Sequence, residues 1–165
     1  MMYFCSCKQH PMQITDFTVR STTELNVQNH LIKVTPSNNE VMPELSPGQF
    51  VQILVENSPN VFLRRPISIN YADREKNELW LLIQRVGEGT RKICEARPGD
   101  TMNLIYPLGN SFTLPKEAGR FLLIGGGVGT APLLFLGKEL HKRQLHADFL
   151  LGGTFRKRYP AARPV

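Results

Sequence analysis

The strongest chemical signal in the sequence is a glycine-rich segment, Gly125-Gly126-Gly127-Val128-Gly129-Thr130-Ala131-Pro132. It stands between the apolar run 120–124 and a helix-favouring stretch, 131–143. Glycine allows positive φ and a close approach to a ligand, and a helix N-terminus offers free N–H groups with a partial positive charge. The segment therefore predicts a pyrophosphate site, with tight strand-to-helix packing as the structural alternative. Its spacing is G-x-G-x-x-P, which differs from the G-x-G-x-x-G of common dinucleotide folds.

A second candidate phosphate site is Gly87-Glu88-Gly89-Thr90-Arg91-Lys92, which follows an apolar run and opens a short helix-favouring segment. Its backbone N–H groups would hold a pyrophosphate, with Arg91 or Lys92 adding positive charge. The structural alternative is a strand-to-helix turn with a threonine cap.

The third candidate is Leu63-Arg64-Arg65-Pro66-Ile67-Ser68-Ile69, a strand-like run that contains a proline. Proline predicts an edge or an interruption of the sheet, where backbone groups turn toward a ligand. Arg65 would clamp a phosphate, and Ser68 would supply a hydroxyl and an N–H beside an apolar ring. Adjacent arginines are also typical of a solvated strand edge, which is the alternative interpretation.

These segments, in this order, resemble the ferredoxin–NADP reductase superfamily. The resemblance is carried by Arg65-Pro66-Ile67-Ser68, Ile83-Gln84-Arg85, Gly89-Thr90, Pro107-Leu108-Gly109-Asn110-Ser111-Phe112 and the turn from Gly125 to Pro132. Within the superfamily they are most similar to the electron-transfer subunits of the two-subunit, NAD-linked dihydroorotate dehydrogenases of pyrimidine synthesis. The similarity runs from about Phe17 to Leu151.

The resemblance implies a site for FAD and a site for NAD. By similarity, FAD would contact Arg65, Pro66, Ile67, Ser68, Ile83, Gln84, Arg85, Gly89 and Thr90, and NAD would contact Gly127, Val128, Gly129 and Thr130. Plant-type members carry an aromatic residue at the position of Ile67, so here an aliphatic side chain would cover the flavin face. The cofactors do the hydride chemistry, so no catalytic acid or base is expected.

The resemblance also implies a partner. The family relays electrons from dihydroorotate through FMN on a catalytic subunit, a [2Fe–2S] cluster and FAD to NAD, in a heterotetramer. Family members continue well past the end of this chain and present four cysteines for the cluster near the C-terminus. Cys5, Cys7 and Cys94 do not occupy that region, so neither the cluster nor any other metal is expected here. NAD binding is expected to be weak or lost, since the nucleotide domain is incomplete.

Short β-favouring runs punctuated by turns fill residues 14–105 around one short helical segment, which predicts a small antiparallel β-barrel. After Gly119 the pattern changes to strand, glycine turn, helix and strand, which is one βαβ unit. We expect a flavin-binding barrel over 1–115, an incomplete α/β nucleotide-binding domain over 116–151, and an atypical basic tail over 152–165. One βαβ unit cannot cover both faces of its sheet, so exposed apolar faces and association are also expected.

The composition is that of an ordinary globular protein, with 41% hydrophobic and 21% charged residues. Four of the six net positive charges come from the last fifteen residues, which hold no acid, so the rest of the chain is nearly balanced. Without basic residues interleaved with aromatic ones, no nucleic-acid partner is expected. No apolar run approaches the ~20 residues of a membrane-spanning helix, and the start lacks a secretory signal. We therefore expect a cytoplasmic protein without a membrane partner.

Three functions are consistent with these patterns. The leading hypothesis is an FAD-binding electron-transfer subunit that passes electrons between a dihydroorotate dehydrogenase catalytic subunit and NAD, impaired by truncation. The alternatives are a stand-alone NAD(P)H-dependent flavin or ferredoxin reductase, and a flavin-binding remnant that catalyses nothing. Because the tail from Gly152 has no helical period and holds two prolines, a truncated or shifted reading frame near that residue is a further hypothesis.

Overall fold

The computed structural model describes residues 11–114 and 119–153 of the chain. In chain order its elements are β1 (Gln13–Glu24), β2 (Asn29–Pro36), β3 (Phe50–Ile53), β4 (Arg65–Asp73), β5 (Glu78–Gln84), α1 (Glu88–Ile93), β6 (Thr101–Leu108), β7 (Arg120–Gly126), the 3₁₀ turn η1 (Gly127–Thr130), α2 (Leu133–Lys142) and β8 (His146–Gly152). The predictions made for Cys5, Cys7 and the tail beyond residue 153 lie outside the described residues.

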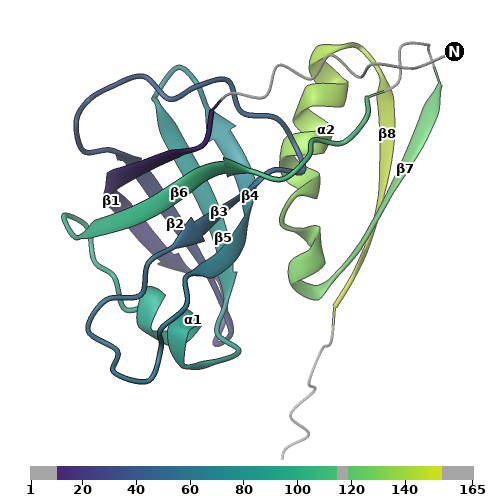
Figure 1. The fold of residues 1–165 in the computed structure, drawn as a ribbon. Coiled ribbons are helices and arrows are strands. Elements are labelled where there is room, and N and C mark those ends of the chain that lie inside the picture. Colours follow the sequence, from purple (N-terminus) through teal and green to yellow (C-terminus); the bar gives the residue numbers. More distant parts are fainter. Residues whose placement is uncertain (1–10, 115–118, 154–165) are drawn as a thin grey trace, which may run out of the picture.

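Strands β1 to β6 close into an antiparallel barrel in the order β1-β2-β5-β4-β3-β6 (Figure 1). Along β2 and β5, buried residues alternate with half-buried ones, as expected for strands with one face on a core. Helix α1 lies at the lower end of the barrel in Figure 1 and connects β5 to β6. The predicted fold class, a small antiparallel barrel followed by part of an α/β domain, is confirmed.

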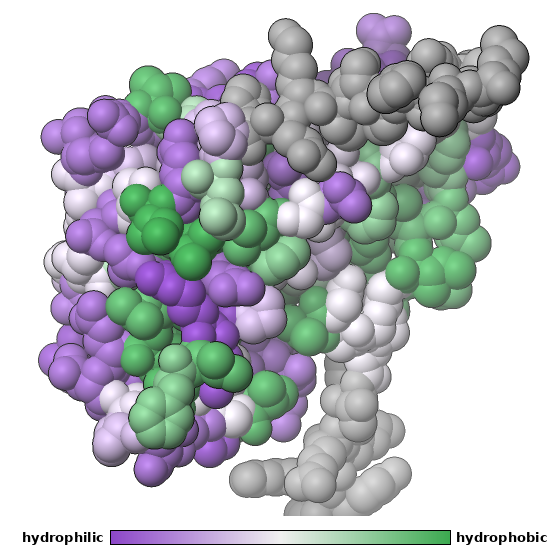
Figure 2. Space-filling model, viewed as in Figure 1, coloured by the Kyte–Doolittle hydropathy of each residue, from purple (hydrophilic) through white to green (hydrophobic). Residues whose placement is uncertain are grey.

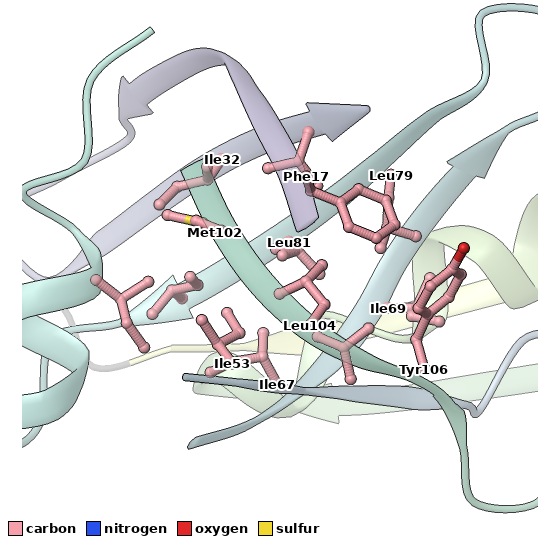
Figure 3. Close-up of a cluster of buried hydrophobic side chains, with 14 of the residues drawn as sticks. Phe17, Ile32, Ile53, Ile67, Ile69, Leu79, Leu81, Met102, Leu104 and Tyr106 are labelled. Carbon is pink, nitrogen blue, oxygen red and sulfur yellow. The ribbon is translucent and has the colours of Figure 1, made fainter. Parts of the chain in front are cut away.

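The barrel core takes apolar side chains from all six strands. Phe17 and Tyr106 pack edge to face, with ring centroids 5.0 Å apart. Figure 3 shows Ile53, Ile67 and Leu104 within the same cluster. Burying one such aliphatic side chain contributes about 1.5–3 kcal/mol to the free energy of folding. The core therefore stabilises the barrel and fixes the positions of its strand ends.

The second unit consists of β7, η1, α2 and β8, and its two strands run parallel. Helix α2 covers one face of this sheet, where the Phe149 ring packs so closely on Gly137 that a side chain there would overlap it. On the other face Leu122, Ile124 and Leu150 are about 60% exposed. Figure 2 shows this hydrophobic surface on the right, over β7 and β8. The predicted exposure of an apolar sheet face is confirmed.

Helix α2 begins later than the sequence predicted, at Leu133 instead of residue 131. The preceding residues form the tighter turn η1, in which the Thr130 hydroxyl donates to the Gly127 carbonyl at 2.8 Å. The Ala131 N–H donates to the Val128 carbonyl at 2.9 Å. Pro132 consequently stands at the N-cap and not inside the first turn of the helix.

None of the helices in residues 11–114 and 119–153 is long and apolar enough to cross a membrane. The same residues contain no group of three or more His, Cys, Asp or Glu side chains that would hold a metal ion.

Candidate functional site

The ladder between β4 and β5 ends before either strand does. Its last pair joins Ile69 to Leu81. Beyond that pair, residues 65–68 stay paired with β3 on their other side, and residues 82–84 stay paired with β2. We call these two stretches, which separate from each other, the β4–β5 fork. The sequence predicted a sheet edge or interruption around Pro66, and the register confirms it.

The β4 side of the fork presents backbone groups. Ile69 donates its N–H to the Gln49 carbonyl on the β3 side, at 3.1 Å. Because successive residues of a strand point their N–H and C=O groups to opposite neighbours, the Ser68 N–H and the Pro66 C=O point toward β5. A donor and an acceptor of β4 therefore face into the fork.

The β5 side of the fork follows the same alternation. Arg85 donates its N–H to the Gln28 carbonyl beside β2, at 2.7 Å. The N–H of the preceding residue, Gln84, therefore points toward β4. The fork thus offers main-chain hydrogen-bonding groups from two strands to one flat, polar-edged ligand.

Two predicted contact residues do not present side chains to the fork. The Ile67 side chain, expected to cover a flavin face, lies in the barrel core with an exposure of 9% (Figure 3). Ile83 is fully buried in the same core. The expected side-chain cover is therefore wrong, because neighbouring residues of a strand alternate between its two faces and both isoleucines fall on the inner one.

The two adjacent arginines have different roles. Arg64 donates from Nη1 to the carbonyls of Gln52 and Asn103, at 3.3 and 3.1 Å, and so ties the chain to β3 and β6. Arg65 donates from Nη1 to the carbonyl of Leu63, at 3.1 Å. The solvated-edge interpretation is wrong for Arg64, and the half-exposed Arg65 is the one that can reach an anion.

Arg65 crosses directly over the start of α1. A Cβ atom added to Gly89 would lie 2.6 Å from Arg65 Nε and 3.2 Å from Val61 Cγ1. Such a short distance requires a neighbouring atom to move, so only glycine allows this approach. The contact brings two of the predicted segments together and places a guanidinium beside the first N–H groups of the helix. This cationic corner closes the open end of the fork.

The Thr90 hydroxyl is occupied within the turn. It accepts hydrogen bonds from the N–H groups of Val86 and Gly87, at 3.0 and 3.1 Å, and donates to the Gly87 carbonyl at 3.1 Å. The capping alternative is therefore confirmed for this hydroxyl, and an FAD contact by Thr90 would have to use its backbone N–H. Both Gly89 and Thr90 are buried.

Behind α1, the Arg85 side chain lies near a buried thiol. Burial raises the pKa of Cys94 to about 11, and the nearby positive charge of Arg85 opposes this increase. The thiol therefore stays protonated at neutral pH, as expected for a structural cysteine. Arg85 Nε is itself buried and has no hydrogen-bond partner among the described residues.

The glycine-rich turn between β7 and α2 has features of both a tight strand-to-helix packing and a phosphate site, the two interpretations of its sequence. At Gly125 a Cβ would lie 2.7 Å from Leu133 Cδ1, so this glycine permits tight packing. Gly127 has a φ of +53°, which favours glycine. At Gly126 and Gly129 no atom of residues 11–114 or 119–153, the chain neighbours apart, lies within 4 Å of an added Cβ, so these residues leave the space above the turn open. This exposed backbone leading into a helix suits a phosphate group.

The sequence did not single out the residue that joins the two predicted cofactor regions. Asn70, on β4, is buried and donates from Nδ2 to the Ala131 carbonyl at 2.7 Å. Beside it the Tyr71 and Phe135 rings pack edge to face, with centroids 5.7 Å apart. Turn η1 also lies against β5. The sequence signal that could have identified Asn70 is a single amide side chain within an otherwise apolar part of the strand. The hydrogen bond of Asn70 holds the glycine-rich turn next to the fork.

A separate cavity of about 950 Å³ lies between the barrel and the end of α2, and none of the predicted cofactor residues lines it. Its charged groups are largely paired. Arg74 lies 3.4 Å from Glu44, and Lys142 donates to Glu139 at 2.6 Å, which raises the pKa of Lys142. The predicted site is therefore the fork and not this cavity.

Solved structures share this fold. Phthalate dioxygenase reductase is 22% identical, with a TM-score of 0.71 over 85% of this chain and 43% of that chain. A cytochrome P450 reductase from Amycolatopsis is 25% identical, with a TM-score of 0.76 over 90% of this chain and 45% of that one. The chain therefore has the fold of the ferredoxin-reductase-like flavoproteins, with part of their nucleotide-binding domain.

Sequence similarity to curated proteins shows which members of this class the chain resembles. An electron transfer subunit of dihydroorotate dehydrogenase B (NAD(+)) from Lysinibacillus sphaericus is 35% identical over 136 residues, 81% of this chain and 52% of that protein. The corresponding subunit from Desulforamulus reducens is 42% identical over 106 residues, 64% of this chain and 40% of that protein. No protein-family model matches. The similarity predicted from the motifs is confirmed: the chain is a relative of these electron transfer subunits and spans about half their length.

Proposed function

We propose that this chain binds FAD in the β4–β5 fork and passes electrons between NAD and a dihydroorotate dehydrogenase catalytic subunit. The observation that carries the proposal is the approach of Arg65 to Gly89, which sets a cation beside a helix N-terminus at the end of the fork. A corner of this kind suits the pyrophosphate of a dinucleotide. The similarity to electron transfer subunits of dihydroorotate dehydrogenase B (NAD(+)) supports the electron-transfer role and the use of NAD.

The residues present fit FAD. The isoalloxazine ring is flat and carries carbonyl oxygens and an N–H on one edge, and the fork directs the N–H groups of Ser68 and Gln84 and the carbonyl of Pro66 toward such an edge. Arg65 would contact the pyrophosphate together with the N–H groups of Gly89 and Thr90. When bound, FAD would supply the redox chemistry, since its ring accepts a hydride and releases single electrons.

We infer a second site, for NAD, at the glycine-rich turn. The open backbone of Gly127, Val128, Gly129 and Thr130 would hold its pyrophosphate. Asn70 keeps this turn against the barrel, so a nicotinamide could meet a flavin in the fork while water is excluded between them.

The division into parts belongs to the same proposal. We infer an FAD-binding barrel over 1–115 and a partial nucleotide-binding unit over 116–151. The partner would be a catalytic subunit in a heterotetramer, a role supported by the name of the relatives as subunits. We assign no iron–sulfur cluster, because Cys94, the free cysteine among the described residues, is buried and alone.

Reconstitution of the purified chain with FAD, followed by absorbance spectroscopy, tests the proposal. We expect a yellow protein with flavin bands. Arg65→Ala should weaken FAD binding by about 10- to 150-fold, which corresponds to the loss of one hydrogen bond between charged groups. Arg20→Ala, at an exposed arginine on β1, should leave binding unchanged. Colourless protein after reconstitution would refute the proposal.

A second measurement separates the electron-transfer role from the stand-alone reductase. We expect NADH to reduce the bound flavin, and reoxidation to need the catalytic subunit. Rapid reduction of free flavin by NADH without any added protein would favour a stand-alone reductase instead.

A further inference from the structure

The loop between β3 and β4 holds an aromatic side chain in water. Phe62 is 88% exposed, and the next residue, Leu63, is 74% exposed. Figure 2 shows hydrophobic surface at the lower left, over the region of this loop. Exposing a whole phenyl ring forgoes the stabilisation that its burial would give, so a ligand that covers the ring would benefit from it.

The residues on either side of this ring are fixed. Val61 donates its N–H to the Ser58 carbonyl at 3.0 Å and is itself buried, with an exposure of 7%. Leu63 accepts the hydrogen bond from Arg65 at 3.1 Å. The ring is therefore presented from a loop whose backbone is held on both sides of it.

The loop is also fixed to the proposed pyrophosphate corner. Val61 Cγ1 lies 3.2 Å from the position that a Cβ of Gly89 would take. The Ser58 hydroxyl donates to Glu88 Oε1, at the start of α1, at 3.0 Å. Because consecutive Cα atoms are about 3.8 Å apart, Phe62 begins one residue beyond the residue that touches Gly89. Since the next residue, Leu63, accepts the hydrogen bond from Arg65, Phe62 stands between two residues that contact this corner.

We propose that Phe62 is the stacking platform for the adenine of FAD, and that it makes this site selective for FAD over FMN. The inference rests on the proposed function, which places the flavin ring in the fork and the pyrophosphate at Arg65 and Gly89. The adenosine half must then continue beyond the corner, and Phe62 is the exposed aromatic residue between the two residues that contact it. An aromatic ring stacks on any nucleobase, and such a contact is sensitive to removal of the ring.

The experiment compares FAD with FMN, which has the same flavin ring and one phosphate but no adenosine. Each is titrated against the full chain and followed by flavin fluorescence. For Phe62→Ala we expect FAD affinity to fall by about 5- to 100-fold, the usual effect of removing one stacked aromatic. FMN affinity should change less than about 2-fold, since the ring lies outside its contacts. Phe62→Trp should retain FAD affinity because it keeps an aromatic face.

Val41→Ala is the matched control, because Val41 is an apolar residue of 83% exposure on another loop. Thermal unfolding followed by circular dichroism checks that each variant is folded. Equal losses for FAD and FMN in Phe62→Ala, or no loss for either, would overturn the inference and favour a protein-contact role for this ring. If the unaltered chain binds neither flavin, the proposed function fails as well, so the two failures give different results.

Discussion

The contact between Arg65 and Gly89 gives the sharpest quantitative prediction. In Gly89→Ala the new methyl would lie 2.6 Å from Arg65 Nε. Arg65 has a flexible side chain held by the hydrogen bond to the Leu63 carbonyl, so its guanidinium would swing away while the backbone stays in place. Alanine is also the better helix former by about 1 kcal/mol. We therefore expect the free energy of unfolding without FAD to change by less than about 1 kcal/mol.

FAD binding should respond much more strongly. Displacing Arg65 removes a hydrogen bond between charged groups, which contributes about 1.5–3 kcal/mol, so the Kd for FAD should rise by about 10- to 150-fold. The measurement is a fluorescence titration of the variant with FAD, next to urea unfolding of the FAD-free protein. A folded Gly89→Ala protein that binds FAD as tightly as the unaltered chain would refute the reasoning.

A double-mutant cycle tests whether the effect passes through Arg65. In an Arg65→Ala background there is no guanidinium to displace, so adding Gly89→Ala should change the Kd by less than about 2-fold. Equal effects of Gly89→Ala in the two backgrounds would show that the methyl blocks the cofactor directly.

Three further predictions concern stability and association. Asn70→Ala leaves the buried Ala131 carbonyl without its donor, so the free energy of unfolding should fall by about 1–3 kcal/mol, and an unchanged urea midpoint would contradict the assigned contact. The pKa of Cys94 is raised from 9.0 to about 11 on folding, so its contribution to stability is complete below pH 9 and is lost as the pH rises toward 11. Urea unfolding between pH 8 and 11 should therefore show a smaller pH slope for Cys94→Ala, and parallel curves would count against the assignment. Ile124→Lys places a charge on the exposed sheet face and should reduce association in sedimentation, whereas the same change at the buried Leu123 should unfold the unit.

The barrel could be predicted from the sequence because its signals are local. Alternation of apolar and polar residues marks strands such as β5, and turn residues separate them. The glycine-rich turn was equally visible, because a strand, glycines and a helix follow each other directly. What the sequence could not supply is the point where β4 and β5 separate. That point depends on an irregularity between Ile69 and Tyr71, which only the paired strand defines.

Two physical causes limit what the sequence says about side chains in the site. Side chains alternate across a strand, so a motif that names neighbouring residues does not say which of them face inward, and the Ile67 side chain was expected on the outer face although it faces the core. A threonine in the first turn of a helix gives the same sequence pattern whether its hydroxyl caps the helix or binds a phosphate. At Thr90 the hydroxyl caps the turn, since it donates to the Gly87 carbonyl. Asn70 was missed because its partner, Ala131, lies 61 residues away.

In the proposed function, the run of β4 from Arg65 to Asn70 sets the distance between the proposed pyrophosphate corner and the glycine-rich turn. It covers five residue steps, or about 17 Å of extended chain, with the pyrophosphate corner at one end and the hydrogen bond to the nucleotide turn at the other. Because this length is set by a strand inside a closed barrel, the two proposed phosphate sites would keep a fixed separation without a hinge movement. A change that bends this run should therefore alter the rate of hydride transfer while leaving the affinity for each nucleotide almost as it was.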